Sequence, residues 1–297
     1  MRWRTGRRSE NVDDLRGAPR VGLPGGGLRI GGGGLIVLLL GAWLLGINPI
    51  MVLQLLAGGG GLSTEISEGS PGSGGPPDPG GAPQDEGADF VSVVLADTED
   101  TWTALFSQAG GRYQVPRLVL FTDLARSACG MAQSAMGPFY CPADHKVYID
   151  LGFYAELQDR FHAPGDFAQA YVIAHEVGHH VQNLLGISQR FSHAMRSLGK
   201  TERNELSVRQ ELQADCFAGL WGHHAQRARN ILEQGDIEEA LAAAAAIGDD
   251  RLQREAGSRV RPESWTHGSS AMRKHWFERG FSQGTIEACD TLGASSL

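Results

Sequence analysis

The stretch AYVIAHEVGHHVQNLLG, residues 170–186, places two histidines four residues apart and a glutamate directly after the first: His175, Glu176 and His179. On a helix, residues four apart lie on one face about 6 Å apart along the axis, so both imidazoles can bind one metal ion. Glu176 is displaced by about 100° and can take a proton from a water at the metal. His180 points elsewhere on the helix and is interpreted as a neighbour, not a ligand. The alternative is a core helix with two satisfied histidines.

A catalytic zinc site usually needs a third protein ligand. One common arrangement has a third histidine six residues after the second, with a glycine three residues after the second, but Leu185 and Gln182 occupy those positions. The stretch RQELQADCFAGLW, residues 209–221, offers Glu211 as the ligand. Asp215, four residues on, can accept a hydrogen bond from the far nitrogen of a zinc-bound histidine. The alternative is a solvated helix face whose acids pair with the arginine that opens this stretch.

His267, in SWTHGSSAMRKHW, is a further candidate for catalysis. A histidine opposite the attacking water can donate a hydrogen bond to the oxyanion of a tetrahedral intermediate. The alternative is a residue at a helix start that caps near Thr266 and Ser269.

These residues need helices and a small sheet to position them. Arg117–Thr122 and Lys146–Leu151 are short runs rich in β-branched and aromatic residues, which predict strands. Val147–Leu151 precedes the metal helix and could be an edge strand that pairs with an extended peptide. Apolar spacing predicts helices over Phe90–Ala109 and over about 166–186, 203–229, 235–247 and 268–280. The predicted fold class is α+β, a mostly helical domain with a small sheet.

The chain has four cysteines, Cys129, Cys141, Cys216 and Cys289, and no C-x-x-C pair. A four-thiolate zinc site is therefore not expected, whereas two disulfides suit a domain outside the cytoplasm. Three pairings are possible, and the short gap favours Cys129–Cys141, which leaves Cys216–Cys289. The alternative is four buried thiols.

Residues 35–57, LIVLLLGAWLLGINPIMVLQLLA, form an apolar run of 23 residues without a charge, long enough to be a transmembrane helix. Residues 1–34 contain seven arginines, whereas residues 58–88 have no basic residue and contain 11 Gly and 5 Pro. This asymmetry predicts a single-pass protein of the cell membrane with residues 1–34 as a basic cytoplasmic segment. Residues 58–88 would be a flexible linker and residues 89–297 an extracytoplasmic domain. A domain that faces the cytoplasm, with reduced thiols, would contradict the arginine bias.

The charge of the predicted domain argues against nucleic acid as a partner. Residues 89–297 carry 19 basic and 26 acidic side chains, a net charge of −7. Such a domain lacks the basic surface that nucleic-acid binding requires. The acidic excess is interpreted as a contribution to solubility.

With these residues in place, the chain resembles the bacterial neutral zinc metallopeptidases. The resemblance rests on the following stretches: RRSENVDDLRG (7–17), CGMAQSAMGPFYCPADHKVYIDL (129–151), AHEVGHHVQNLLG (174–186), SVRQELQADCFAGLW (207–221), THGSSAMRKHWFERGF (266–281) and CDTL (289–292). It implies a zincin with two histidine ligands and a distal glutamate, which map onto His175, His179 and Glu211, with Glu176 catalytic. Trp265 and Leu292 stand where the family pattern leads us to expect Phe.

The predicted function is therefore hydrolysis of peptide bonds by a membrane-anchored, zinc-dependent peptidase with one Zn²⁺ per chain. Its partner would be a protein or peptide substrate. The alternative is a catalytically silent zinc-binding scaffold at the membrane, which would have no use for a general base at Glu176. Mixed histidine and carboxylate sets also bind Mn²⁺, Co²⁺ or Fe²⁺.

Overall fold

The computed structural model describes residues 1–16, 85–133, 137–295 and 297. Its strands are β1 (Val12–Asp14), β2 (Arg117–Phe121), β3 (Leu124–Ser127), β4 (Gly130–Gln133), β5 (Phe139–Cys141) and β6 (Lys146–Asp150). Four of them form one sheet in the order β1-β2-β6-β5, and β3 and β4 form a separate hairpin. β1, β2 and β6 run parallel, whereas β5 runs antiparallel to β6.

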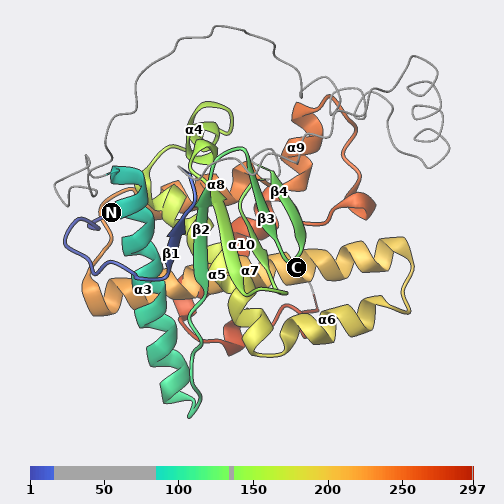
Figure 1. The fold of residues 1–297 in the computed structure, drawn as a ribbon. Coiled ribbons are helices and arrows are strands. Elements are labelled where there is room, and N and C mark those ends of the chain that lie inside the picture. Colours follow the sequence, from blue (N-terminus) through green and yellow to red (C-terminus); the bar gives the residue numbers. More distant parts are fainter. Residues whose placement is uncertain (17–84, 134–136, 296) are drawn as a thin grey trace, which may run out of the picture. The chain divides into compact units, whose positions relative to one another are not determined.

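Helices make up most of the described domain and form its main core. They are α3 (Glu86–Gln108), α4 (Gly152–Asp159), α5 (Asp166–Leu184), α6 (Ile187–Met195), α7 (Lys200–Arg229), α8 (Asp236–Ala246), α9 (Asp249–Glu255) and α10 (Ser270–Gln283). Helices α5 and α7 lie behind the sheet in Figure 1, and the β3–β4 hairpin lies in front of it. The α+β class is therefore confirmed. Both predicted strands and all five predicted helices are present, and α4, α6, α9 and the short strands were not predicted.

Two glycines bring α7 and α10 into close contact. A Cβ atom on Gly219 would lie 2.0 Å from the carbonyl oxygen of Phe277, and one on Gly280 would lie 1.9 Å from that of Cys216. Any larger residue at either position would push the helices apart. Gly178 has a similar role between α5 and α7, because a Cβ there would lie 3.0 Å from the carbonyl oxygen of Ala214. The three helices that carry the site chemistry are thus packed backbone to backbone.

Residues 1–16 are part of the folded domain, which differs from the prediction of a separate basic segment over residues 1–34. Strand β1 pairs with β2, and the side chains of Met1 and Trp3 are buried at 8% and 7% exposure. Trp3 packs edge to face against Phe90 of α3, with ring centroids 5.3 Å apart. All the residues that the structure describes, 1–16 among them, belong to one compact unit.

Charge pairing explains this docking of an arginine-rich segment. Its arginines form ion pairs with acidic residues on and next to α3: Arg4 with Glu86, Arg7 with Glu99 and Asp100, Arg8 with Asp89, and Arg16 with Asp85. In the sheet, Arg117 and Lys146 lie directly opposite each other, and the carboxylate of Asp13 pairs with both. Like charges opposite each other destabilise a sheet unless they are neutralised. The arginine bias predicted a separate cytoplasmic segment, because these acidic partners are remote in sequence and give no local signal.

The α-ammonium group of Met1 lies among acidic side chains of α5 and α8. It is 2.5 Å from Asp166 and 3.3 Å from Asp236. These two residues and Glu239 form a second group of acids close enough to hold a cation. The ammonium group already supplies the positive charge there, and Glu239 accepts a hydrogen bond from the backbone of Phe167.

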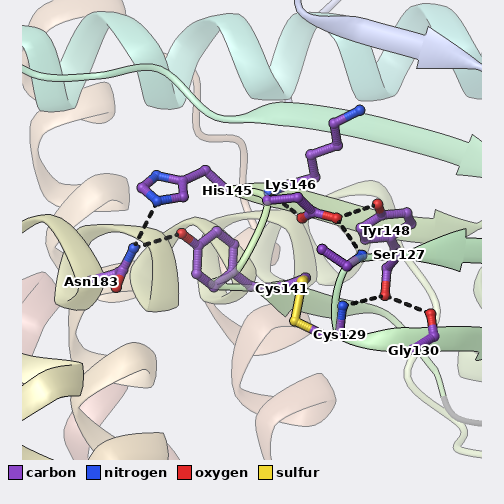
Figure 2. The surroundings of a disulfide bond; sticks show 11 residues. Ser127, Cys129, Gly130, Cys141, His145, Lys146, Tyr148 and Asn183 are labelled. Carbon is purple, nitrogen blue, oxygen red and sulfur yellow. Dashed lines mark hydrogen bonds between the residues drawn. A yellow bond between two sulfur atoms is a disulfide. The ribbon is translucent and has the colours of Figure 1, made fainter.

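The two disulfides join the pairs that the spacing favoured, Cys129–Cys141 and Cys216–Cys289. The first attaches the turn between β3 and β4 to the end of β5 (Figure 2). The second links α7 to the short 3-10 helix η3 (Glu287–Cys289) near the C-terminus. The two disulfides therefore anchor β5 and α7, the strand and the helix that carry Cys141 and Cys216.

The edge strand next to the metal helix is β5, not β6. Residues 147–151 were predicted to form an edge, but β6 lies between β2 and β5 in the sheet. β5 was overlooked because its three residues give too short a pattern to read as a strand. Within the described residues, one side of β5 pairs with β6 and no strand pairs with its other side.

The predicted transmembrane run 35–57 lies outside the described residues, as does the predicted linker up to residue 84. The last residues of that linker belong to the start of α3, where Asp85 accepts hydrogen bonds from the backbone amides of Gly87 and Ala88. Among the helices that the structure describes, none combines the length and apolar character needed to cross a bilayer.

Candidate metal centre

Helix α5 carries His175, Glu176 and His179 and is buried along most of its length. It continues without a break through the motif, so the two histidines lie one turn apart on one face. Their imidazole ring centroids are 4.9 Å apart and the rings are perpendicular, at 89°. Both rings line the same cavity.

Glu211 of α7 meets the two histidines at one point. Its Oε2 atom lies 3.3 Å from Nε2 of His175, and its Oε1 atom lies 3.4 Å from Nε2 of His179. Bonds of about 2.0–2.1 Å at a tetrahedral angle would separate two ligands of one zinc ion by about 3.4 Å. Their ligand atoms form one of the two groups among the described residues that are close enough to hold a metal ion. The donor set and its spacing therefore fit Zn²⁺.

The far nitrogens of both rings have partners that leave the Nε2 lone pairs free for a metal. Nδ1 of His175 lies 2.9 Å from Oδ1 of Asp215. Nδ1 of His179 lies 2.9 Å from Oε1 of Gln182. The amide nitrogen of Gln182 donates to the backbone oxygen of Gln210, so its oxygen is the atom that accepts from His179. Each neutral ring therefore carries its proton on Nδ1.

Asp215 is buried in a network with Arg273 of α10 and Tyr171 of α5. The guanidinium group of Arg273 donates two hydrogen bonds of 2.8 Å to the Asp215 carboxylate, one to each oxygen. Tyr171 donates its hydroxyl hydrogen to the same carboxylate. Asp215 and Arg273 have exposures of 0% and 1%, so the alternative of a solvated helix face does not hold. Arg209 instead donates to backbone oxygens near the C-terminus.

The site concentrates charge where a cation would bind. Burial alone would lower the pKa of His175, but Asp215 and Glu211 reverse this and raise it to about 10. Burial opposes ionisation of Glu211 as well, yet the two histidines hold the pKa of its carboxyl well below the usual range. In the metal-free protein, protons on the imidazoles balance the carboxylate. A metal ion must displace those protons to bind.

Glu176 projects into the same cavity from the next position on α5. Its side chain is 7% exposed and forms no hydrogen bond with the described residues. Burial raises the pKa of its carboxyl, an effect that the two neighbouring histidines partly oppose. A carboxylate whose pKa is shifted towards neutrality, with no competing partner, is suited to accept a proton from water.

His180 does not contribute to the metal site but links α5 to the edge strand β5. Its Nε2 donates to the backbone oxygen of Gln114 at 2.6 Å, and its Nδ1 accepts from the hydroxyl of Tyr140 at 3.0 Å. Burial lowers the pKa of His180 to about 4, so the ring is neutral at pH 7. The same hydroxyl accepts a hydrogen bond from Asn183, which also contacts His145 (Figure 2). These contacts hold β5 alongside the metal helix.

His267 lines the cavity from the loop before α10, with its side chain 51% exposed. Oδ2 of Asp249 accepts the backbone N–H groups of Thr266, His267 and Gly268 at 2.8, 2.6 and 2.9 Å. The backbone N–H of Asp249 donates in return to the oxygen of Gly268. Ser269, not His267, caps α10 by accepting from the backbone of Met272. The start of α9 therefore fixes the loop that presents His267.

Three residues with clear positions in the site were not predicted: Gln182, Asp249 and Arg273. Gln182 lies three residues after His179, where a hydrogen bond along the helix face can be anticipated. Asp249 is the first residue of the short helix α9, which was not predicted. Arg273 carries no local signal, because its partner Asp215 is 58 residues away in the sequence.

Two histidines one turn apart on α5 and a glutamate from α7 form a candidate metal centre. The chain belongs to the family described as "Putative neutral zinc metallopeptidase", whose model matches residues 1–292.

Relatives of the chain are known from several bacteria. It is 50% identical to "Uncharacterized protein YpfJ" of Escherichia coli K12 over 300 residues, which cover 99% of this chain and 100% of the relative. It is 40% identical to "Uncharacterized protein Rv2575" of Mycobacterium tuberculosis H37Rv over 218 residues, or 70% of this chain and 73% of the relative. "Uncharacterized protein Mb2605" of Mycobacterium bovis matches with the same identity and coverage. No solved structure matches the chain.

Proposed function

We propose that the chain is a zinc-dependent metallopeptidase that hydrolyses peptide bonds. The observation that supports it is the convergence of the Nε2 atoms of His175 and His179 on the two oxygens of Glu211, at 3.3 and 3.4 Å. Glu176 lines the same cavity, and its carboxylate has no hydrogen-bond partner among the described residues. Three protein ligands leave one coordination position for water or substrate, as in catalytic zinc sites.

Each residue of the site has a role in the proposed reaction. Zn²⁺ bound by the three ligands would lower the pKa of water and polarise the scissile carbonyl. Glu176 takes a proton from the attacking water and passes it to the leaving amine. Asp215 and Gln182 hold the imidazoles with Nε2 towards the cavity. His267 donates a hydrogen bond to the carbonyl oxygen as negative charge develops on it.

The strand β5 supports a peptide as the substrate. Phe139 and Tyr140 of this strand line the cavity that contains the metal site. One side of β5 pairs with β6, so its other side offers backbone groups to an extended peptide. The disulfide to Cys129 and the hydrogen bonds of Tyr140 fix the strand in this position.

The test of the reaction is the variant Glu176→Gln. It should retain about one zinc per chain, because Glu176 is not a ligand, while hydrolysis of a peptide library falls by several orders of magnitude. Glu205→Gln, an exposed glutamate on α7, serves as the matched control. Unchanged hydrolysis in Glu176→Gln would refute the assignment of the general base.

The second candidate is a zinc-stabilised scaffold that does not cleave. Three ligands and a free carboxylate argue against it, since structural zinc sites are four-coordinate and closed. Lack of metal-dependent hydrolysis in the wild type, with partner binding retained, would favour the scaffold.

The ligand role of Glu211 is tested separately. The variant Glu211→Ala should lose zinc on dialysis. Retention of one zinc per chain would exclude Glu211 as a ligand.

We also propose that the domain lies outside the cytoplasm, anchored by the apolar run 35–57. The two disulfides support this location. The arginine bias predicts that residues 1–16 lie in the cytoplasm. Their contacts with α3 and β2, however, require them to lie on the same side of the membrane as the domain.

Labelling of Thr5→Cys and Gln108→Cys in intact cells with a membrane-impermeant maleimide distinguishes these two arrangements. Labelling of Gln108→Cys alone supports a single crossing, and labelling of both supports docking.

A further inference from the structure

The cavity at the metal site has both polar and apolar side chains in its lining. It has a volume of about 630 Å³, with His175, Glu176 and His179 in its lining. Ser188 and Ser192 of α6, the helix that follows α5, also line it. Five apolar side chains of the lining are called the apolar wall: Phe153, Phe161, Val172, Ile247 and Leu252.

The apolar wall is built by three segments that are remote in sequence. Val172 lies one helical turn before Glu176, so it places the wall directly beside the reacting groups. Phe153 of α4 and Phe161 pack against each other, with ring centroids 6.3 Å apart. Arg251 of α9 donates to the backbone oxygen of Phe161 at 2.9 Å, which ties α9 to the segment after α4.

Strand β5 begins where the wall ends. Gly137, two residues before β5, has positive φ, and a Cβ atom there would lie 3.6 Å from the ring of Phe153. A peptide that extends along β5 from the metal site towards Gly137 therefore reaches the wall. Alternate side chains of an extended peptide point to the same side, so one of them faces the apolar wall.

The charges near the wall neutralise each other. Glu156 and Arg160 lie at its solvent side, 47% and 65% exposed, and form an ion pair of 3.6 Å. The guanidinium group of Arg160 also covers the ring of Phe161, 4.9 Å from its centroid. Neither charge is left unpaired to bind a charged side chain, and an unpaired charge that enters the wall would lose its hydration.

We propose that the apolar wall is the specificity subsite of this enzyme and receives one bulky apolar side chain of a peptide, such as Phe, Leu, Ile or Met. The side chain belongs to a residue next to the scissile bond. This inference rests on the proposed peptidase function and names its substrate class: peptides with a bulky apolar residue at one fixed position relative to the cleaved bond.

Binding can be tested without cleavage in the Glu176→Gln protein. Fluorescent peptides that differ only at one central residue, Phe, Leu, Ala or Asp, are titrated and followed by anisotropy. The Phe and Leu peptides should bind at least about tenfold more tightly than the Ala and Asp peptides, in the range that a well-matched apolar pocket provides. The added substitution Phe153→Ala should remove most of this preference.

The matched control is Phe106→Ala. Phe106 is also half-buried and packs against aromatic neighbours, but it lies on α3 and does not line the cavity. Thermal unfolding of both variants shows whether a general loss of stability accounts for an effect. A preference that survives in Phe153→Ala, or that falls equally in Phe106→Ala, overturns the subsite.

Cleavage of a proteome-derived peptide library by the wild type separates this inference from the proposed function. Cleavage sites with a bulky apolar residue at one fixed position support both. Cleavage without such enrichment overturns the subsite and leaves the peptidase function intact. Apolar preference in binding with no cleavage overturns the peptidase function and leaves the subsite intact, and failure of both measurements overturns both.

Discussion

Asp215 holds the imidazole of His175 by its Nδ1 atom, at 2.9 Å, and lies one turn after Glu211, which faces Nε2 of the same ring at 3.3 Å. One helix face of α7 thus contacts both nitrogens of a single histidine. The orientation of His175 and the position of the third ligand are coupled, because both depend on where α7 packs against α5.

Replacement Asp215→Asn should weaken both zinc binding and the fold. The amide leaves the buried Arg273 without its carboxylate partner, and breaking such a pair costs roughly 3–5 kcal/mol of unfolding free energy. Loss of the carboxylate behind His175 should lower zinc affinity about 10- to 100-fold. Chelator competition and denaturant unfolding measure the two effects, with Glu205→Gln as the control. Wild-type zinc affinity in Asp215→Asn would show that the contact does not orient the ligand.

Zinc binding should strengthen as the pH rises from 6 to 9. Burial opposes protonation of His175, but Asp215 and Glu211 raise its pKa to about 10 in the metal-free protein, and the pKa of His179 is raised as well. Zinc needs the unprotonated rings, so it must displace protons throughout this range. Affinity should rise about tenfold per pH unit for each proton displaced. Chelator competition at several pH values gives the slope, and a slope of zero would contradict the proton balance.

The same ionisation affects the metal-free fold in the opposite direction. A histidine whose pKa is raised on folding stabilises the protein fully below its unfolded pKa, 6.5. That contribution disappears as the pH rises through the folded value of about 10. The metal-free protein should therefore lose unfolding free energy between pH 7 and 10, measured by denaturant unfolding, whereas the zinc-bound protein should lose less.

Asp249 should act on turnover through His267. His267→Ala should lower kcat about 10²- to 10³-fold if its hydrogen bond stabilises the oxyanion. Asp249→Asn should lower kcat by a smaller factor with little change in KM, because the loop that presents His267 loses its anchor. The double variant should be no slower than His267→Ala alone. Additive losses in the double variant would indicate that Asp249 has a purely structural role, and zinc content serves as the control for the metal site.

Docking of residues 1–16 should contribute measurably to stability. Trp3→Ala removes a buried ring from its contact with Phe90 and should cost about 3 kcal/mol or more of unfolding free energy. Trypsin should then cleave faster after Arg7 and Arg8. Leu15→Ala, at a residue that is 49% exposed, is the control and should change little. Equal stability and equal cleavage in the two variants would mean that the segment is not held by Trp3.

The sequence by itself determined the parts of this protein that depend on local geometry. His175, Glu176 and His179 could be placed together because residues one helical turn apart must share a face. The apolar periodicity of the long helices was readable for the same reason, and the two longer strands were predicted from their β-branched and aromatic residues. Glu211 and Asp215 could be paired on one face of a later helix, with Glu211 as the third ligand, and the resemblance to a family implied the same assignment.

Tertiary structure decided what lies opposite each of these faces. Arg273 meets Asp215, Asp249 holds the loop of His267, β5 becomes the edge strand, and residues 1–16 pack on α3. Each contact joins segments separated by many residues, and none produces a local pattern in the sequence. Close helix packing at Gly178, Gly219 and Gly280 sets these distances, and that packing exists only once the whole chain has folded.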